Sequence, residues 1–63
     1  MRDRSVVKDR VLSFIVSKNR GVPKNEIRDT LRVGYPIINE VLEELKKGGY
    51  VEYLGQSKGW IAL

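Results

Sequence analysis

The chain has 63 residues, a net charge of +4, and neither cysteine nor histidine. This length provides one small hydrophobic core, near the lower limit for a chain that folds alone, and no deep substrate cleft. The missing cysteine and histidine exclude a disulfide framework and the usual zinc sites, and no apolar run is long enough for a membrane span. We therefore expect one domain over residues 1–63, without metal or cofactor, in the cytoplasm.

The positive charge is concentrated in the first half of the sequence. Residues 1–32 hold nine basic and four acidic groups, a balance of +5, whereas residues 33–63 hold three basic and four acidic groups, a balance of −1. A cationic surface favours an anionic partner. The distribution predicts that most of the positive field comes from the first half.

The first predicted helix covers residues 5–18. Its apolar positions are Val7, Val11, Leu12, Phe14 and Ile15. Ser5 is a candidate N-cap, and Asp3 competes for that position. Val6 and Val16 add more apolar surface than one buried stripe requires. Either the core surrounds this helix on several sides, or part of the helix forms a homodimer contact.

A turn containing Pro23 separates the first helix from a second, over residues 24–31. Val22 precedes the proline and can pair briefly with a later strand, but Pro23 limits this pairing to one or two hydrogen bonds. In the second helix, Ile27 and Leu31 are four residues apart and are expected to face inward.

The third predicted helix covers residues 35–47. Pro36 lies in its first turn, where the missing N–H has no cost. Its apolar residues recur at the spacing i, i+3, i+4 and i+7, typical of one helix face, and are Ile38, Val41, Leu42 and Leu45. Gly48 and Gly49 end the helix.

Two β-prone segments, 50–54 and 60–63, flank a glycine-containing turn and predict a hairpin. Trp60 begins the second strand. We expect it to cover one end of the core with its indole N–H in water; the alternative is that it stacks on a nucleic-acid base.

The whole pattern resembles the winged helix-turn-helix superfamily of prokaryotic, archaeal and viral regulators. The residues that carry the resemblance are Ile27, Leu31, Val33, Ile38, Leu42, Leu45, Gly49 and Val51. It implies an α/β (α+β) fold with three helices and a C-terminal β-hairpin wing. The fold also serves in protein docking, so the resemblance does not fix the function.

A more distant resemblance is to the Z-alpha group, which binds left-handed DNA or RNA. Asn39 and Trp60 are similar in position to two contact residues of that group. Tyr35 stands where the group has a lysine, Glu43 where it has a tyrosine, and the turn at 55–59 lacks its prolines.

In the winged helix fold, the third helix enters the DNA major groove. The resemblance implies contacts from Lys24, Asn25, Arg28, Arg32, Tyr35, Pro36, Asn39, Glu40, Gln56, Ser57 and Lys58. Asn39 suits adenine, because its amide donates and accepts at once, or it is a solvated helix residue. Glu40 suits cytosine N4 or faces water. Tyr35 suits a thymine methyl group, or it packs the start of the third helix against the neighbouring helix.

The basic candidates suit DNA phosphates. Lys24, Asn25 and Arg28 begin the second helix, where free N–H groups and the helix dipole favour an anion. Arg32 flanks the turn between the helices, and Lys58 lies in the hairpin turn. Each charge taken singly is also explained as a solvated surface group. Their clustering on one expected face favours binding.

Three carboxylates in the third helix oppose this interpretation. Glu40, Glu43 and Glu44 share one side of the helix and would repel phosphates. Either Glu43 and Glu44 lie beyond the duplex, toward a partner subunit or arginines of the first helix, or this surface docks a protein.

We therefore expect a small, nucleoid-associated transcriptional regulator of an archaeon, phage, virus or plasmid that binds double-stranded DNA sequence-specifically. A single module offers few contacts, so we also expect a homodimer through the first helix. The alternative is a protein-interaction module without nucleic-acid binding. An enzyme and a small-molecule substrate are not expected.

Overall fold

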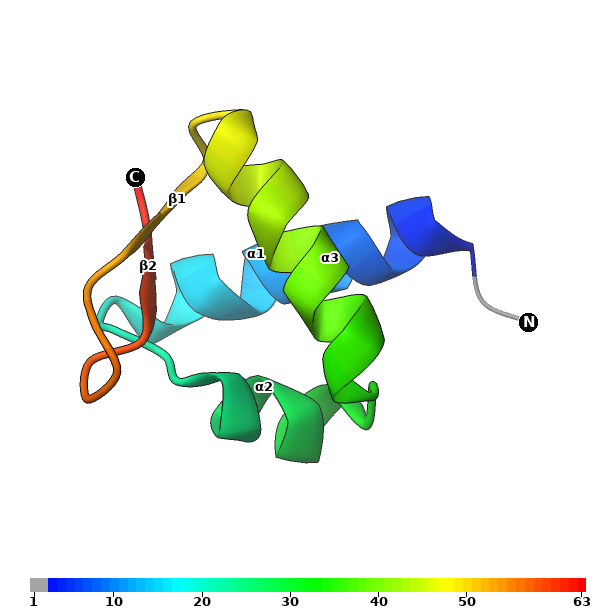
Figure 1. Ribbon diagram of the computed structural model, residues 1–63, viewed down its shortest axis with the longest axis horizontal. Coiled ribbons are helices and arrows are strands. Elements are labelled where there is room, and N and C mark those ends of the chain that lie inside the picture. Colours follow the sequence, from blue (N-terminus) through cyan, green and yellow to red (C-terminus); the bar gives the residue numbers. More distant parts are fainter. Residues whose placement is uncertain (1–2) are drawn as a thin grey trace.

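Three helices precede a two-stranded antiparallel hairpin in the computed structural model, which describes residues 3–63 (Figure 1). The elements are α1 (Arg4–Lys18), α2 (Lys24–Leu31), α3 (Tyr35–Lys47), β1 (Val51–Tyr53) and β2 (Trp60–Ala62). In the hairpin, Val51 pairs with Ala62 and Tyr53 pairs with Trp60. The chain is thus a small α+β domain with its hairpin at the C-terminal end.

The predicted helices agree with the structure to within one residue, but both strands are shorter than predicted. Tyr50 does not begin β1, because its N–H donates to the Leu45 carbonyl (2.9 Å) and closes the end of α3. Gly49 supports this closure with a φ of +80°. The hydrogen bonds at the helix end therefore decide where the strand begins.

The structure corrects the sequence prediction at the start of α1 and adds an unpredicted feature at the end of α2. The prediction of Ser5 as N-cap is wrong: Asp3 is the N-cap, and its carboxylate accepts from the Ser5 N–H at 3.1 Å. At the end of α2, Arg32 adopts a left-handed φ of +56°, and its N–H donates to the Arg28 carbonyl at 2.7 Å. An arginine therefore occupies a conformation that glycine adopts at less cost.

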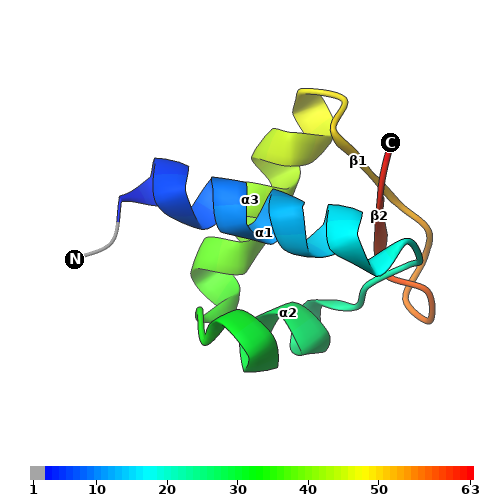
Figure 2. The ribbon, with the colours of Figure 1, turned by 180° about the vertical axis from the view of Figure 1, so that it is seen from behind.

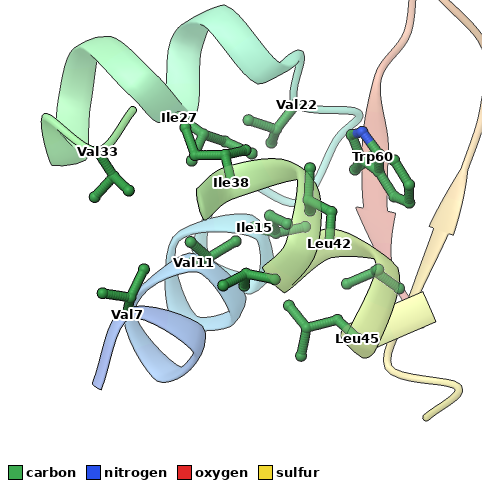
Figure 3. Packing of buried hydrophobic residues seen from close by; sticks show 12 residues of the cluster. Val7, Val11, Ile15, Val22, Ile27, Val33, Ile38, Leu42, Leu45 and Trp60 are labelled. Atoms are coloured by element: carbon green, nitrogen blue, oxygen red, sulfur yellow. The ribbon is translucent and has the colours of Figure 1, made fainter. Parts of the chain in front are cut away.

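The core lies between the three helices and the hairpin (Figures 2 and 3). Its buried members are Val7, Val11, Ile15, Val22, Ile27, Val33, Ile38, Val41, Leu42, Leu45, Val51 and Trp60. α3 contributes four of them, as its apolar spacing predicts. Leu31 is only half-buried, whereas Val6 and Val16 are 46% and 57% exposed. The interpretation that the core surrounds α1 on several sides is therefore wrong for these two valines, which the core does not cover.

An isolated antiparallel β-bridge joins the α1–α2 turn to the hairpin, the brief pairing predicted for Val22. Val22 and Trp60 exchange two backbone hydrogen bonds, of 2.7 and 2.8 Å. The close approach requires glycine at Gly59, where a Cβ would overlap the Val22 carbonyl, and at Gly21, where a Cβ would overlap the Lys58 carbonyl. Backbone packing thus fixes the hairpin against the start of α2.

Trp60 covers one end of the core, but its indole N–H is not in water. The residue is 5% exposed, and its Nε1 is buried without a hydrogen-bond partner among residues 3–63. Tyr53 packs on it, with ring centroids 4.8 Å apart. The prediction of a solvated indole nitrogen is therefore wrong, because the neighbouring strand and turn enclose the ring.

Within the described residues, no helix combines the length and the apolar character that crossing a membrane requires.

Candidate nucleic-acid interface

The hairpin turn, α2 and the first turn of α3 follow one another along one edge of the molecule, the lower edge in Figure 1. We call this surface, formed by residues 55–59, 24–32 and 35–36, the α2 edge. Nine of the eleven residues predicted to contact nucleic acid belong to it. Those nine are Lys24, Asn25, Arg28, Arg32, Tyr35, Pro36, Gln56, Ser57 and Lys58. All are exposed except Lys24, which is half-buried, so the edge is accessible to a ligand.

At one end of the α2 edge, the start of α2 and the hairpin turn form a shallow depression. Its lining includes Lys24 and Asn25 from α2 and Gln56 from the turn. Tyr53 also lines it, although we did not predict Tyr53 as a site residue. The pairing of Tyr53 with Trp60 places it here, and that register follows from tertiary structure. The depression therefore brings together the Lys24 ammonium, the two amides of Asn25 and Gln56, and the Tyr53 ring.

In the middle of the edge, Arg28 links α2 to α3. Its guanidinium carbon lies 4.9 Å from the centre of the Tyr35 ring, a cation–π distance. Its Nε and Nη2 donate to Asp29 at 3.1 and 2.9 Å. The hydrogen bond to Asp29 raises the pKa of Arg28 above its already high ordinary value, so the group stays cationic. Tyr35 and Asp29 thus hold the guanidinium in place, and Asp29 offsets part of its charge.

The carboxylate of Glu26, in the first turn of α2, is paired with basic residues from the end of α1 and the turn that follows it. Glu26 accepts a hydrogen bond from Arg20 at 2.9 Å and lies 3.9 Å from the Lys18 ammonium. The sequence alone does not reveal this pairing, because it depends on how α1 and α2 meet. Within residues 3–63, Lys24, Arg32 and Lys58 make no ion pair. Three cations on the edge are therefore available to an anionic ligand.

The other two predicted contact residues, Asn39 and Glu40, lie further along α3. Glu40 forms, with Glu43 and Glu44, a surface that we call the acidic patch, and Asn39 lies beside it. A shallow depression there is lined by Arg4, Asn39, Glu40, Glu43, Glu44 and Lys47. Arg4 of α1 pairs with Glu40. The first helix therefore does supply an arginine to this patch, but to Glu40 and not to Glu43 or Glu44, which make no ion pair in the described chain. Asn39 lies at the border between a cationic and an anionic surface.

Metal binding receives no support from the described residues, where no three acidic side chains are grouped to hold an ion.

Comparisons of the chain with protein-family models, with curated proteins and with solved structures found no match. What the α2 edge binds is therefore inferred from its own residues and from their arrangement in the fold.

Proposed function

We propose that this chain is a winged helix-turn-helix protein that binds double-stranded DNA through the α2 edge, as a small transcriptional regulator. The observation that carries this proposal is the line of accessible cations along the edge, from the hairpin turn through α2 to the start of α3. Phosphate neutralisation by such groups supplies much of the affinity of DNA-binding proteins. The hairpin acts as the wing.

In this arrangement, α2 and the wing hold the DNA backbone while the first half of α3 enters the major groove. Lys58 belongs to the hairpin turn, Lys24 begins α2, and Arg32 is the C-cap of α2 next to α3, so the cations are spread along the edge to suit phosphates on either side of a groove. Tyr35, held beside Arg28, and the exposed Asn39 present one aromatic and one amide group to base edges. Glu43 and Glu44 belong to the second half of α3, away from α2, where they make no contact with the duplex but are near enough to repel its phosphates.

The main competing function is the docking of a basic protein partner on the acidic patch. The depression that Asn39 shares with Glu40, Glu43 and Glu44 favours it. DNA binding through the α2 edge predicts an affinity that falls with salt and with the loss of edge cations, whereas the docking function predicts no salt-dependent DNA binding, so one set of titrations separates them.

Fluorescence anisotropy with a duplex selected from a random pool tests DNA binding. With about four phosphate contacts, the logarithm of the association constant is expected to fall against the logarithm of salt concentration with a slope of about −3.6. Lys24→Gln and Arg28→Gln are each expected to weaken binding by about fivefold to tenfold and to reduce the slope by about one.

Lys46→Gln is the control. The substitution removes the same charge as Lys24→Gln, and Lys46 is exposed and makes no ion pair within residues 3–63. Lys46 lies in the last turn of α3, whereas the α2 edge includes only the first turn of that helix. Equal losses from Lys46→Gln and Lys24→Gln, or an affinity that does not respond to salt, would contradict binding through this edge.

Substitutions of Arg32 separate the stability of the fold from DNA binding. Arg32→Gly relieves the left-handed backbone and is expected to leave the free energy of unfolding unchanged or raise it by up to about 1 kcal/mol. Arg32→Gln keeps the backbone strain. Both lose the charge, so both are expected to weaken DNA binding by about fivefold. Urea denaturation and anisotropy on the two variants check this; an unchanged DNA affinity in both would remove Arg32 from the interface.

A further inference from the structure

The outer side of α1, together with the turn between α3 and β1, forms a second surface of mixed character. A shallow depression there is lined by Ser5, Lys8, Asp9, Leu12, Leu45 and Tyr50. Val16 follows Leu12 by four residues, so both lie on the same side of α1. Val16 is 57% exposed and Tyr50 is 53% exposed. We call these seven residues the α1 face.

The apolar part of the α1 face extends to the end of β2. The Leu63 N–H donates to the Tyr50 carbonyl at 2.9 Å, which places Leu63 beside Tyr50. Leu63 is 74% exposed. Exposed apolar side chains that are grouped in this way favour contact with another protein surface.

The charges on the α1 face decide which partner it fits. Lys8 and Asp9 are neighbours in the chain, and neither makes an ion pair within residues 3–63. A two-fold contact brings the same patch of two copies together, so the patch must complement itself. Here the two-fold axis can place each Lys8 opposite the Asp9 of the other copy, so that both charges are paired.

The other two exposed surfaces lack this property. The cations of the α2 edge and the carboxylates of the acidic patch would each meet groups of the same sign across a two-fold axis, and like charges in contact disfavour association. Of the three surfaces, the α1 face is therefore the one suited to a second copy of the chain.

We propose that the chain forms a two-fold homodimer through the α1 face, with Leu12, Val16 and Tyr50 at its centre and two Lys8–Asp9 ion pairs at its rim. The Tyr50 side of this face adjoins the C-terminal end of α3, on the opposite side of the molecule from α2 (Figure 1). Both copies thus keep the α2 edge exposed. The association does not depend on what that edge binds.

Sedimentation equilibrium over a range of protein concentrations tests the homodimer. Lys8→Glu makes both side chains at positions 8 and 9 negative, and Asp9→Lys makes both positive, so each variant places like charges opposite one another across the two-fold axis. Each is expected to raise the dimer dissociation constant by about tenfold or more. The double substitution Lys8→Asp with Asp9→Lys exchanges the two charges and is expected to restore association to within about threefold of the original chain. Far-ultraviolet circular dichroism verifies that each variant is folded.

Lys24→Glu is the control, because it reverses a charge on the α2 edge. It is expected to leave the dimer unchanged while weakening DNA binding, so the two proposals can fail separately. A chain that sediments as a monomer at about 1 mM overturns the homodimer. So do single charge reversals without effect, or a double substitution that does not recover association.

Discussion

Replacing Gly59 with alanine is expected to cost about 3 kcal/mol or more of folding free energy, enough to unfold most molecules of a domain this small. Gly59 has a φ of +77°, and its added Cβ would overlap the carbonyl of Val22. That carbonyl accepts the Trp60 N–H at 2.8 Å, so it cannot move without breaking the β-bridge between Val22 and Trp60. Backbone strain and steric overlap therefore act together at one position.

Gly49→Ala is the matched control for this prediction. Gly49 has nearly the same φ, +80°, but its Cβ would have no atom within 4 Å. Only the conformational cost of about 1 kcal/mol is expected there. Urea denaturation followed by circular dichroism gives both values. Equal losses at the two glycines would show that the contact with Val22 does not constrain the fold.

Neutralising Glu43 and Glu44 together is expected to strengthen DNA binding by about tenfold at low salt, or about 0.7 kcal/mol for each charge. Both side chains are exposed and lie on the helix proposed to enter the groove, so each opposes the approach of phosphates. The gain should shrink as salt screens the charges. Anisotropy titrations of the Glu43→Gln, Glu44→Gln double variant at two salt concentrations measure the effect.

Glu52→Gln controls for net charge, since Glu52 is equally a surface carboxylate but belongs to β1. It is expected to change DNA affinity by less than about twofold. If the double variant binds DNA no better than the Glu52 variant, the acidic patch does not face the duplex. If the double variant no longer binds a basic protein that the original chain binds, the result supports the docking function.

The helices could be predicted from the sequence because their signals are local. The spacing of Ile38, Val41, Leu42 and Leu45 needs only the period of an α-helix, and all four are buried. The glycines and β-prone residues predict the hairpin, but not where its strands end. The start of β1 depends on Tyr50, whose N–H is taken by α3, and such competition between elements is not visible in composition.

The surface was harder to predict than the core, because its pairings join distant segments. The ion pair between Arg4 and Glu40 arises from the packing of α1 against α3, and Glu26 meets Arg20 at the junction of α1 and α2. Tyr53 joins the candidate site through its strand register with Trp60. Charge counts along the chain predicted a basic first half, but not which cations remain unpaired.

The exchange of hydrogen bonds between Val22 and Trp60 also has a consequence for recognition. It fastens the base of the hairpin to the segment leading into α2, so the hairpin turn and α2 are held in a fixed relation to each other. If the α2 edge binds DNA as proposed, association immobilises only the side chains at the tip of the turn, and the entropic cost of ordering a loop is avoided. A preorganised surface of this kind would favour geometric discrimination between duplexes over adaptation to each one.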